Sequence, residues 1–368
     1  MNFLDYFEPL TFSIEPQKGY LSNNWTFLSA ENAEKLKIKN YSLALITIST
    51  ENNDIFFKEF RNIFYQLANH TFKLYKAIDL GCLKKTSTFS DTLYATRDVV
   101  EFLLEQKVCP IIISDNQYIP YAIYLAYEVL RKHVSIGAAE AIIHVKKNKN
   151  HYLPQILSKK DNTLFNYTIL GYQNYFCHPN EINALNTLYF DHIRLGDIQA
   201  DITQTEPYIR ECDTFFFHAS SLKHAFLPQF ENTSDNGLTV KEACQIARYA
   251  GFADKLSSFS YLFDSSQKQN PLSLAEIIWH FVDGFFARKH DYPAGSIQKL
   301  TKFHVEVSTN NFITFFKSPK SNRWWMEIPL PKTDFKKKWL VACSENDYLM
   351  ACSGIVPDKW YYSYQKVM

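Results

Sequence analysis

Three apolar runs of the sequence end in clusters of polar residues that could do chemistry. One cluster follows PIII, the second follows AII and the third follows TFFF. The candidate residues in these clusters are Asp115, Asn116, His144, Lys146, Asn148, His218 and Ser220. Carboxylate, imidazole and hydroxyl groups bind metal ions or transfer protons. Since ligands bind at the carboxyl ends of the strands in open α/β sheets, we expect the three clusters to line one cleft.

The runs before these clusters have the composition of buried strands. Their residues are β-branched or aromatic, and several runs are apolar at successive positions, as expected when both faces of a sheet are covered. The predicted strands are 43–48, 110–114, 140–145, 167–170, 214–219 and 257–263.

Helical patterns separate these strands. Thr239 and Glu242 form a capping-box pattern before one helix, and Ser273 and Glu276 repeat it before a second helix with a long apolar stripe. Because strands and helices alternate, we predict an α/β fold in which helices cover both faces of a mostly parallel sheet.

The pattern changes after about Pro293. FHVEVSTNNFITFFKS alternates like a hairpin, and the rest of the chain is rich in Trp, Tyr and Pro with few helical signals. We therefore predict three parts: an N-terminal elaboration over residues 1–40, a main α/β domain over 41–293, and a β-rich C-terminal extension over 294–368 that packs on the main domain.

Composition and charge exclude several classes of partner. The chain has 368 residues, 46% of them hydrophobic, and a formal net charge of +1. A folded protein of this charge has no field that attracts nucleic acid or an anionic membrane, and the run Lys336-Lys337-Lys338 is predicted to be a short solvated loop. No apolar run reaches the roughly 18 residues of a membrane span. The N-terminal stretch lacks the pattern of a signal peptide.

Cysteine usage and motif content exclude several kinds of enzyme. The seven cysteines form no CxxC pair, which favours reduced thiols and a cytoplasmic location. Cys177 and His178 are adjacent, so their side chains point apart and do not form a catalytic pair. The motifs of a nucleophile elbow, a P-loop and a dinucleotide-binding fold are absent. Trp324 and Trp360 are predicted to pack in a core rather than stack on bases.

The order of these segments resembles the ureohydrolase superfamily of arginase, agmatinase and formimidoylglutamase. Asp79 begins a segment that looks like the Asp-Leu-Gly segment of that family, followed by a helix and the strand that carries its Gly-Gly-Asp-His motif. Asp235 begins a segment similar to its Gly-Leu-Thr segment. WWMEIP and PDKWYYSY resemble the C-terminal extension of a bacterial formimidoylglutamase-like subgroup. The main resemblance covers roughly residues 40 to 290.

This resemblance implies a three-layer α/β/α domain with two Mn(II) ions, bridged by carboxylates and by a hydroxide that attacks a guanidinium or formimino carbon. Such a centre needs several negative carboxylates to hold two divalent cations close together. Members of the family commonly form trimers or hexamers, so a homo-oligomer is a further expectation.

Each of the three metal motifs departs from the family pattern. Gly-Gly-Asp-His reads ISDN at 113–116, which keeps the aspartate and loses the histidine. Asp-x-His-x-Asp reads HVKKN at 144–148, which places a lysine ammonium where a metal cation should bind. Asp-x-Asp reads HAS at 218–220, so that both bridging carboxylates are lost.

These substitutions leave several roles open. Asp115, His144 and His218 are the candidate ligands if a different metal binds, such as zinc in a site completed by His224. Alternatively, the histidines are hydrogen-bonded core residues, and Asp115 is a general base or the cap of the next helix. Lys146 replaces the charge of a metal ion if its side chain is buried.

We therefore expect a catalytically inactive ureohydrolase-like protein that holds no metal or cofactor. It would act as a scaffold, an interaction protein with an unidentified protein partner, or a small-molecule-binding protein. The alternative is a hydrolase of linear amidines with an altered Mn²⁺ site. A third interpretation is a binding module that reuses the old substrate cleft, with an open polar pocket around Asp115, Lys146, His218 and Ser220.

Overall fold

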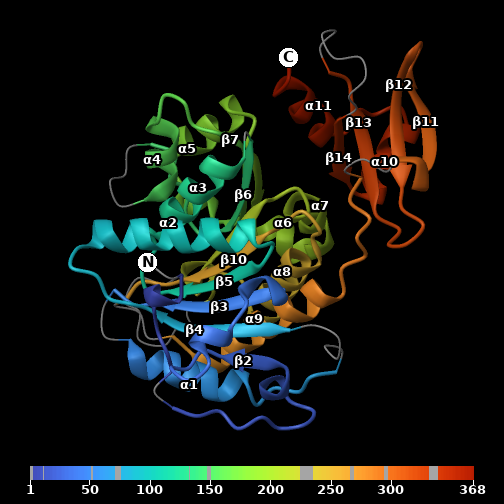
Figure 1. Cartoon of the computed structure of the whole chain (residues 1–368). Coiled ribbons are helices and arrows are strands. Elements are labelled where there is room, and N and C mark those ends of the chain that lie inside the picture. Colours follow the sequence, from blue (N-terminus) through green and yellow to red (C-terminus); the bar gives the residue numbers. More distant parts are fainter. Residues whose placement is uncertain are drawn as a thin grey trace.

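The computed structural model describes residues 3–10, 12–50, 53–70, 76–131, 133–146, 151–223, 235–265, 269–293, 297–330 and 339–368. These residues form two sheets, a large one in the main body and a smaller one near the C-terminus (Figure 1). In this part of the chain, no helix combines the length and the apolar character that crossing a membrane requires.

The large sheet has ten strands in the order β1-β4-β3-β5-β10-β9-β6-β7-β8, with β2 also paired to β4. β1 runs antiparallel to β4, and the other pairings are parallel. The strands are β1 (Phe7–Glu8), β2 (Trp25–Phe27), β3 (Leu43–Ile48), β4 (Ala77–Leu83), β5 (Cys109–Ser114), β6 (Val134–Ala139), β7 (Leu164–Tyr172), β8 (Asp191–Arg194), β9 (Thr214–His218) and β10 (Ser258–Leu262).

Helices cover both faces of this sheet and enclose two apolar cores. One core joins α1 (Asp54–Phe64), α6 (Leu195–Ala200), α7 (Glu206–Ile209), α8 (Val240–Phe252) and α9 (Pro271–Phe286) to one face. The other core joins α2 (Phe89–Glu105), α3 (Ile119–Leu130), α4 (Tyr152–Ser158) and α5 (Pro179–Thr187) to the opposite face. Leu45 of β3 lies in the first core and its neighbour Ile46 in the second, because successive strand residues face opposite sides. The predicted three-layer, mostly parallel α/β architecture is confirmed.

The smaller sheet is antiparallel and has the order β11-β12-β13-β14. Its strands are β11 (Thr301–Ser308), β12 (Asn311–Lys317), β13 (Trp324–Ile328) and β14 (Trp339–Cys343). α10 (Glu345–Cys352) and α11 (Asp358–Gln365) follow it. The predicted hairpin and β-rich extension are confirmed, but the two final helices were not expected from the sequence. Ser344 and Asp347 form a capping box at α10, which is the local signal for that helix.

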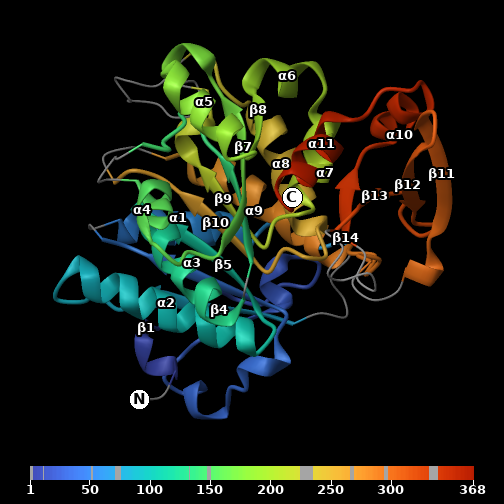
Figure 2. The ribbon, with the colours of Figure 1, turned by 90° about the horizontal axis from the view of Figure 1, so that it is seen from above.

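The C-terminal sheet lies beside α7 and α8 of the main body (Figures 1 and 2). The guanidinium of Arg210 donates to the carbonyl of Cys343 at 3.1 Å and lies over the ring of Trp325. The amide of Ala342 donates to Glu211 at 2.8 Å. These contacts hold β13 and β14 against the main body.

Two local predictions were wrong. β6 ends at Ala139, so the predicted strand 140–145 is a loop instead. α9 begins at Pro271, and Asn270 caps it by accepting hydrogen bonds from the amides of Leu272 and Ser273. A proline in the first turn is preorganised for a helix start, which explains why this start precedes the predicted box at Ser273. The box at Thr239 and Glu242 is confirmed at α8.

Candidate functional site

Glu140 is the centre of a buried polar cluster at the carboxyl edge of the large sheet. It directly follows β6, and His218 is the last residue of the neighbouring strand β9. Ala139 and Phe217 are paired across these parallel strands, so the next residue on each strand lies side by side. Nε2 of His218 is 2.8 Å from Oε1 of Glu140, and both side chains are almost fully buried.

The start of α4 completes the cluster, which we call the Glu140 network (Glu140, His151, Tyr152, Tyr167 and His218). Nε2 of His151, the N-cap residue of α4, is 3.2 Å from Oε2 of Glu140. The hydroxyl of Tyr152 donates to Oε1 of Glu140 at 2.6 Å and lies 3.1 Å from the hydroxyl of Tyr167. Three side chains from two elements thus face one carboxylate.

The hydrogen bonds determine which nitrogen of His151 carries a proton. Its Nδ1 accepts a hydrogen bond from the amide of Leu153 at 3.3 Å. Nδ1 is therefore unprotonated, and the proton lies on Nε2, which points to the carboxylate. Nε2 of His151 is therefore placed to donate to Glu140.

The same contacts keep Glu140 ionised. Burial by itself raises the pKa of this carboxyl, but the adjacent His218 and His151 hold the pKa well below its usual range. Burial and the negative charge of Glu140 raise the pKa of Tyr152 and Tyr167, so both phenols stay protonated. The cluster is therefore arranged to stabilise a buried anion.

His144 lies at the border of the Glu140 network. Its ring centroid is 4.6 Å from that of His151, and the side chain is half-buried. Burial and then the neighbouring His151 lower the pKa of His144, which favours the neutral imidazole. The structure thus brings two predicted candidates, His144 and His218, to the same edge of the sheet.

The donor set of this edge does not fit a pair of Mn(II) ions. Over the described ranges, no group of three or more His, Cys, Asp and Glu side chains is positioned to hold a metal. Two hard divalent cations require several carboxylate oxygens, whereas Glu140 is surrounded here by two imidazoles and a phenol.

Asp115 has a different task from the one expected. Its carboxylate accepts hydrogen bonds from Ser49, from the amide and hydroxyl of Thr50, and from Asn53, at 2.7 to 3.1 Å. These donors belong to the loop between β3 and α1, and Asn53 is the N-cap residue of α1. The N-cap residue of α3 is Tyr118, which has no side-chain cap. The prediction that Asp115 caps the next helix was wrong, because the neighbouring strand brings a loop rich in donors to it.

The remaining predicted residues lie apart from the network. Lys146 is exposed, so the hypothesis that its ammonium replaces a metal charge inside the protein was wrong. Ser220 is also exposed, while the next residue, Ser221, is buried and donates to the carbonyl of His218 at 2.7 Å. Asn116 accepts a hydrogen bond from the amide of Tyr118 at 2.8 Å. Asn148 and His224 lie outside the described residues.

Sequence reasoning missed Glu140, His151 and Tyr152. Glu140 was assigned to the start of a strand, because the residues after it are more apolar than the strand before it. The signal that could have found it is its position as the first charged residue after the run VSIGAA. Counted from the true strand end, the second motif reads Glu140-Ala-Ile-Ile-His144, which retains one carboxylate.

The Asp-Leu-Gly segment has a structural task. Asp79 forms a buried bidentate ion pair with Arg61 of α1, with N to O distances of 2.8 and 3.1 Å. The hydroxyl of Tyr65 donates to the same carboxylate at 2.7 Å. This ion pair fastens α1 to β4, since both charges are fully buried and paired.

Solved structures of ureohydrolases resemble this fold. Formimidoylglutamase from Bacillus subtilis subsp. subtilis str. 168 superposes with a TM-score of 0.63 and 12% identity, over 77% of this chain and 98% of that one. Formiminoglutamase from Trypanosoma cruzi with Mn²⁺ gives a TM-score of 0.60 and 14% identity, over 68% of this chain and 96% of that one. Agmatine ureohydrolase of Thermoplasma volcanium gives a TM-score of 0.54 and 13% identity, over 75% of this chain and 95% of that one.

Comparison of the sequence alone gives no match. No protein-family model and no curated protein matches the chain. At such low identity, the likeness of the structures concerns the fold, and activity must be argued from the site. The order of the strands, the two helical layers and these superpositions together show that the chain has the fold of the ureohydrolase superfamily.

Proposed function

We propose that this chain is a non-catalytic ureohydrolase-fold protein in which the Glu140 network stands where a metal centre would lie. The observation that carries the proposal is that the buried carboxylate of Glu140 is already contacted by His151, Tyr152 and His218. Such a cluster stabilises its own charge, because a phenol donates to the carboxylate and two imidazoles lie within ion-pair distance of it. In this proposal the fold serves as a scaffold for a protein partner or a small molecule.

The motif residues support this proposal. The Trypanosoma cruzi formiminoglutamase structure contains Mn²⁺. The family pattern places carboxylates at positions that read His144, His218 and Ser220 in this chain. His218 is turned to Glu140, and Ser220 is exposed. A binuclear centre would therefore lack most of its bridging oxygens.

Metal content tests the proposal most directly. The protein is purified with Mn²⁺ present, its bound metal is measured by mass spectrometry, and hydrolysis of formimidoylglutamate, agmatine and arginine is assayed. Bacillus subtilis formimidoylglutamase is the positive control. We expect no retained Mn²⁺ and no hydrolysis. Two retained Mn²⁺ ions per chain, or turnover that depends on added metal, would overturn the proposal.

The alternative is a metal-dependent amidine hydrolase with an altered site. It is favoured by the convergence of Glu140, His151 and His218 at one strand edge, because these residue types are also ligands of borderline metals such as zinc. Metal binding would require Nε2 of His151 to lose the proton that it now directs to Glu140. Zinc bound in the wild type but lost in Glu140→Gln would support this alternative, and the Mn²⁺ experiment would then need repeating with zinc.

A cytoplasmic location and a homo-oligomer belong to the same proposal. All seven cysteines are free, and five of them are buried, which is typical of proteins in a reducing compartment. Sedimentation or light scattering of the purified chain will test the oligomer. A monomer at micromolar concentration would contradict that part.

A further inference from the structure

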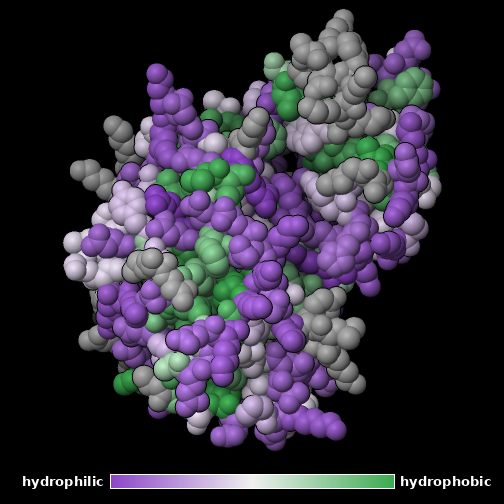
Figure 3. Space-filling model, viewed as in Figure 1, coloured by the Kyte–Doolittle hydropathy of each residue, from purple (hydrophilic) through white to green (hydrophobic). Residues whose placement is uncertain are grey.

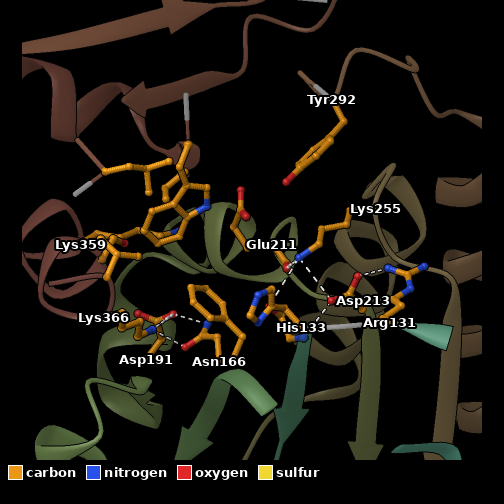
Figure 4. Close-up of a pocket in the computed structure, with 17 residues that line it drawn as sticks. Arg131, His133, Asn166, Asp191, Glu211, Asp213, Lys255, Tyr292, Lys359 and Lys366 are labelled. Carbon is orange, nitrogen blue, oxygen red and sulfur yellow. Dashed lines mark hydrogen bonds and ion pairs between the residues drawn. The ribbon is translucent and has the colours of Figure 1, made fainter. Parts of the chain in front are cut away.

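The two edges of the C-terminal sheet have different neighbours. The edge strand β14 faces the main body, where its residues Trp339 and Val341 line a cavity of about 630 Å³ (Figure 4). The amide of Ala342, which lies between them in sequence, donates to Glu211 at 2.8 Å. The main body therefore satisfies a polar group of this edge.

The charged side chains around this cavity contact one another. Asp213 forms an ion pair with Arg131 and lies 3.4 Å from Nζ of Lys255, and Figure 4 shows both basic side chains pointing toward it. Nζ of Lys366, on α11, donates to Asn166 of β7 at 2.5 Å. The β14 side of the sheet is thus already bound to the main body.

β11 forms the opposite edge of this sheet. In the part of the chain that the structure describes, it pairs with β12 and with no other strand. Figures 1 and 2 both show it at the outer margin of the C-terminal sheet, away from the main body. Every second residue of such a strand directs its amide and carbonyl groups outward. Among the described residues, no backbone hydrogen bond joins β11 to anything outside its hairpin.

The side chains of β11 alternate between polar and apolar. Lys302, His304 and Glu306 are exposed, and Figure 3 shows a mostly hydrophilic surface along this margin. Phe303 and Val305 pack instead into the apolar core of the C-terminal sheet. The strand therefore has one face suited to water and one face suited to a continued apolar layer.

The free edge ends at Glu306. Its Oε1 accepts the amide of Asn310 in the hairpin turn at 3.1 Å, and its second oxygen can face another cation. The pairing register shifts between Glu306 and Ser308, which makes Val307 a bulge. A Cβ on Gly354, in the turn after α10, would lie 3.4 Å from the carbonyl oxygen of Val307. A bulge and a covering turn both end strand pairing.

The alternation restricts how a second copy could pair with this edge. Residues directly opposite each other in an antiparallel pair have side chains on the same face, so the two-fold axis must pass through a residue. With the axis at His304, Lys302 of each copy faces Glu306 of the other. In the same register, Phe303 of each copy faces Val305 of the other. An axis at Phe303 would lose both ion pairs.

This complementarity distinguishes β11 from a protected edge. Charged residues commonly protect edge strands from pairing, and they do so when like charges meet. Here the two charges have opposite sign and are placed symmetrically about His304, so a second copy meets attraction at both positions.

We propose that two copies of this chain associate through β11 in antiparallel register centred on His304, so that their C-terminal sheets form one continuous sheet. The interface specifies the homo-oligomer proposed above and rests on that part of the proposed function alone. The paired segment, residues 302 to 306, is short, so the dissociation constant should lie in the micromolar range.

Sedimentation of the full chain, from low micromolar to submillimolar concentration at low salt, tests the interface by charge reversal. The wild type should form a dimer. Lys302→Glu and Glu306→Lys each bring like charges together twice, and each should weaken the dimer by about tenfold or more. An equal mixture of the two variants should form a mixed dimer, because every contact then joins opposite charges. Lys320→Glu makes the same charge change in the turn after β12 and should dimerise as the wild type does.

Hydrogen exchange supplies a second readout. Amides of β11 should exchange more slowly as the wild-type concentration rises, whereas those of Lys302→Glu should not change. A wild type that stays monomeric throughout would overturn both the interface and the homo-oligomer. An oligomer that survives both charge reversals, or two monomeric variants that fail to pair when mixed, would overturn the β11 interface and leave the homo-oligomer and the absence of catalysis to their own tests.

Discussion

The two edges of the large sheet handle a buried charge in opposite ways. At the carboxyl edge, Glu140 is an anion that two histidines and a tyrosine surround. At the amino edge, Lys359 is a buried cation with no hydrogen-bond acceptor among the described residues, although the carboxylates of Asp191, Glu211 and Asp347 act on its charge. A buried charge with hydrogen-bond partners costs less free energy to bury than one without them. The Glu140 network therefore differs from the opposite edge, where a cavity lies between the large sheet and the C-terminal part of the chain.

The largest expected effect is at Glu140. Glu140→Ala should lower the free energy of unfolding by about 3–5 kcal/mol, because the Tyr152 hydroxyl loses its acceptor and two buried imidazoles lose the carboxylate that they face. Urea unfolding measures this loss. Glu105→Ala, at an exposed glutamate, should change stability by about 0.5 kcal/mol or less. A loss at Glu140 no larger than that at Glu105 would show that the network does not stabilise the fold.

Acid should weaken the carboxyl edge next. The folded protein holds the pKa of Glu140 well below the ordinary value of 4.5, so its contribution is complete above that value. As pH falls below it, the unfolded chain takes up the proton first, and stability decreases. Urea unfolding from neutral to acid pH should therefore show that the difference in free energy of unfolding between wild type and Glu140→Gln becomes smaller. A constant gap would mean that Glu140 has no depressed pKa.

A substitution at Asp115 tests whether its carboxylate is structural or instead catalytic or metal-binding. Asp115→Asn should lower the free energy of unfolding by about 1–3 kcal/mol, since the new amide group faces donors where an acceptor is needed. The amide of Thr50, which now donates to Asp115 at 2.7 Å, should also exchange its hydrogen faster. Unfolding and hydrogen exchange measure the two effects. If Asp115→Asn loses bound metal with its stability unchanged, the structural interpretation is wrong.

The smallest effect should be at Lys359. Lys359→Met should change stability by about 1 kcal/mol or less, or increase it, because the cost of burying the ammonium offsets its cation–π contact. Burial lowers the pKa of Lys359, so the unfolded chain holds this proton to higher pH. The wild type should therefore gain stability relative to Lys359→Met as pH rises through the alkaline range. A large loss in Lys359→Met at neutral pH would reveal an acceptor inside the chain.

Much of the fold was predictable because its signals are local. β3 spans the predicted residues 43–48, and Thr239 caps α8 as its capping box indicates. Both follow from the apolar pattern and from hydrogen bonds between residues close in sequence.

β6 was misplaced for a tertiary reason. Gly137 and the two alanines after it have weak strand propensity, so the strand was assigned to the apolar residues that follow. In the structure, a Cβ on Gly137 would lie 2.5 Å from the ring of Phe215 on the neighbouring strand. The small residue is needed because that ring occupies the space, which only the packed sheet reveals.

The site was harder to predict than the fold. The sequence indicated that His144 and His218 lie at strand ends, and the structure brings both to the border or interior of the Glu140 network. His151 was not expected there, because it reaches Glu140 from the first residue of a helix rather than from a strand end.

By itself, the sequence determined the alternation of strands and helices and the cap at Thr239. Tertiary structure decided which polar groups meet. Glu140 meets side chains from β9 and α4, and Lys359 of α11 has no hydrogen-bond acceptor among the described residues. The physical reason is that caps and periodicity depend on neighbours within a few residues, whereas pairing of a buried charge depends on elements up to 200 residues apart, as with Lys366 and Asn166.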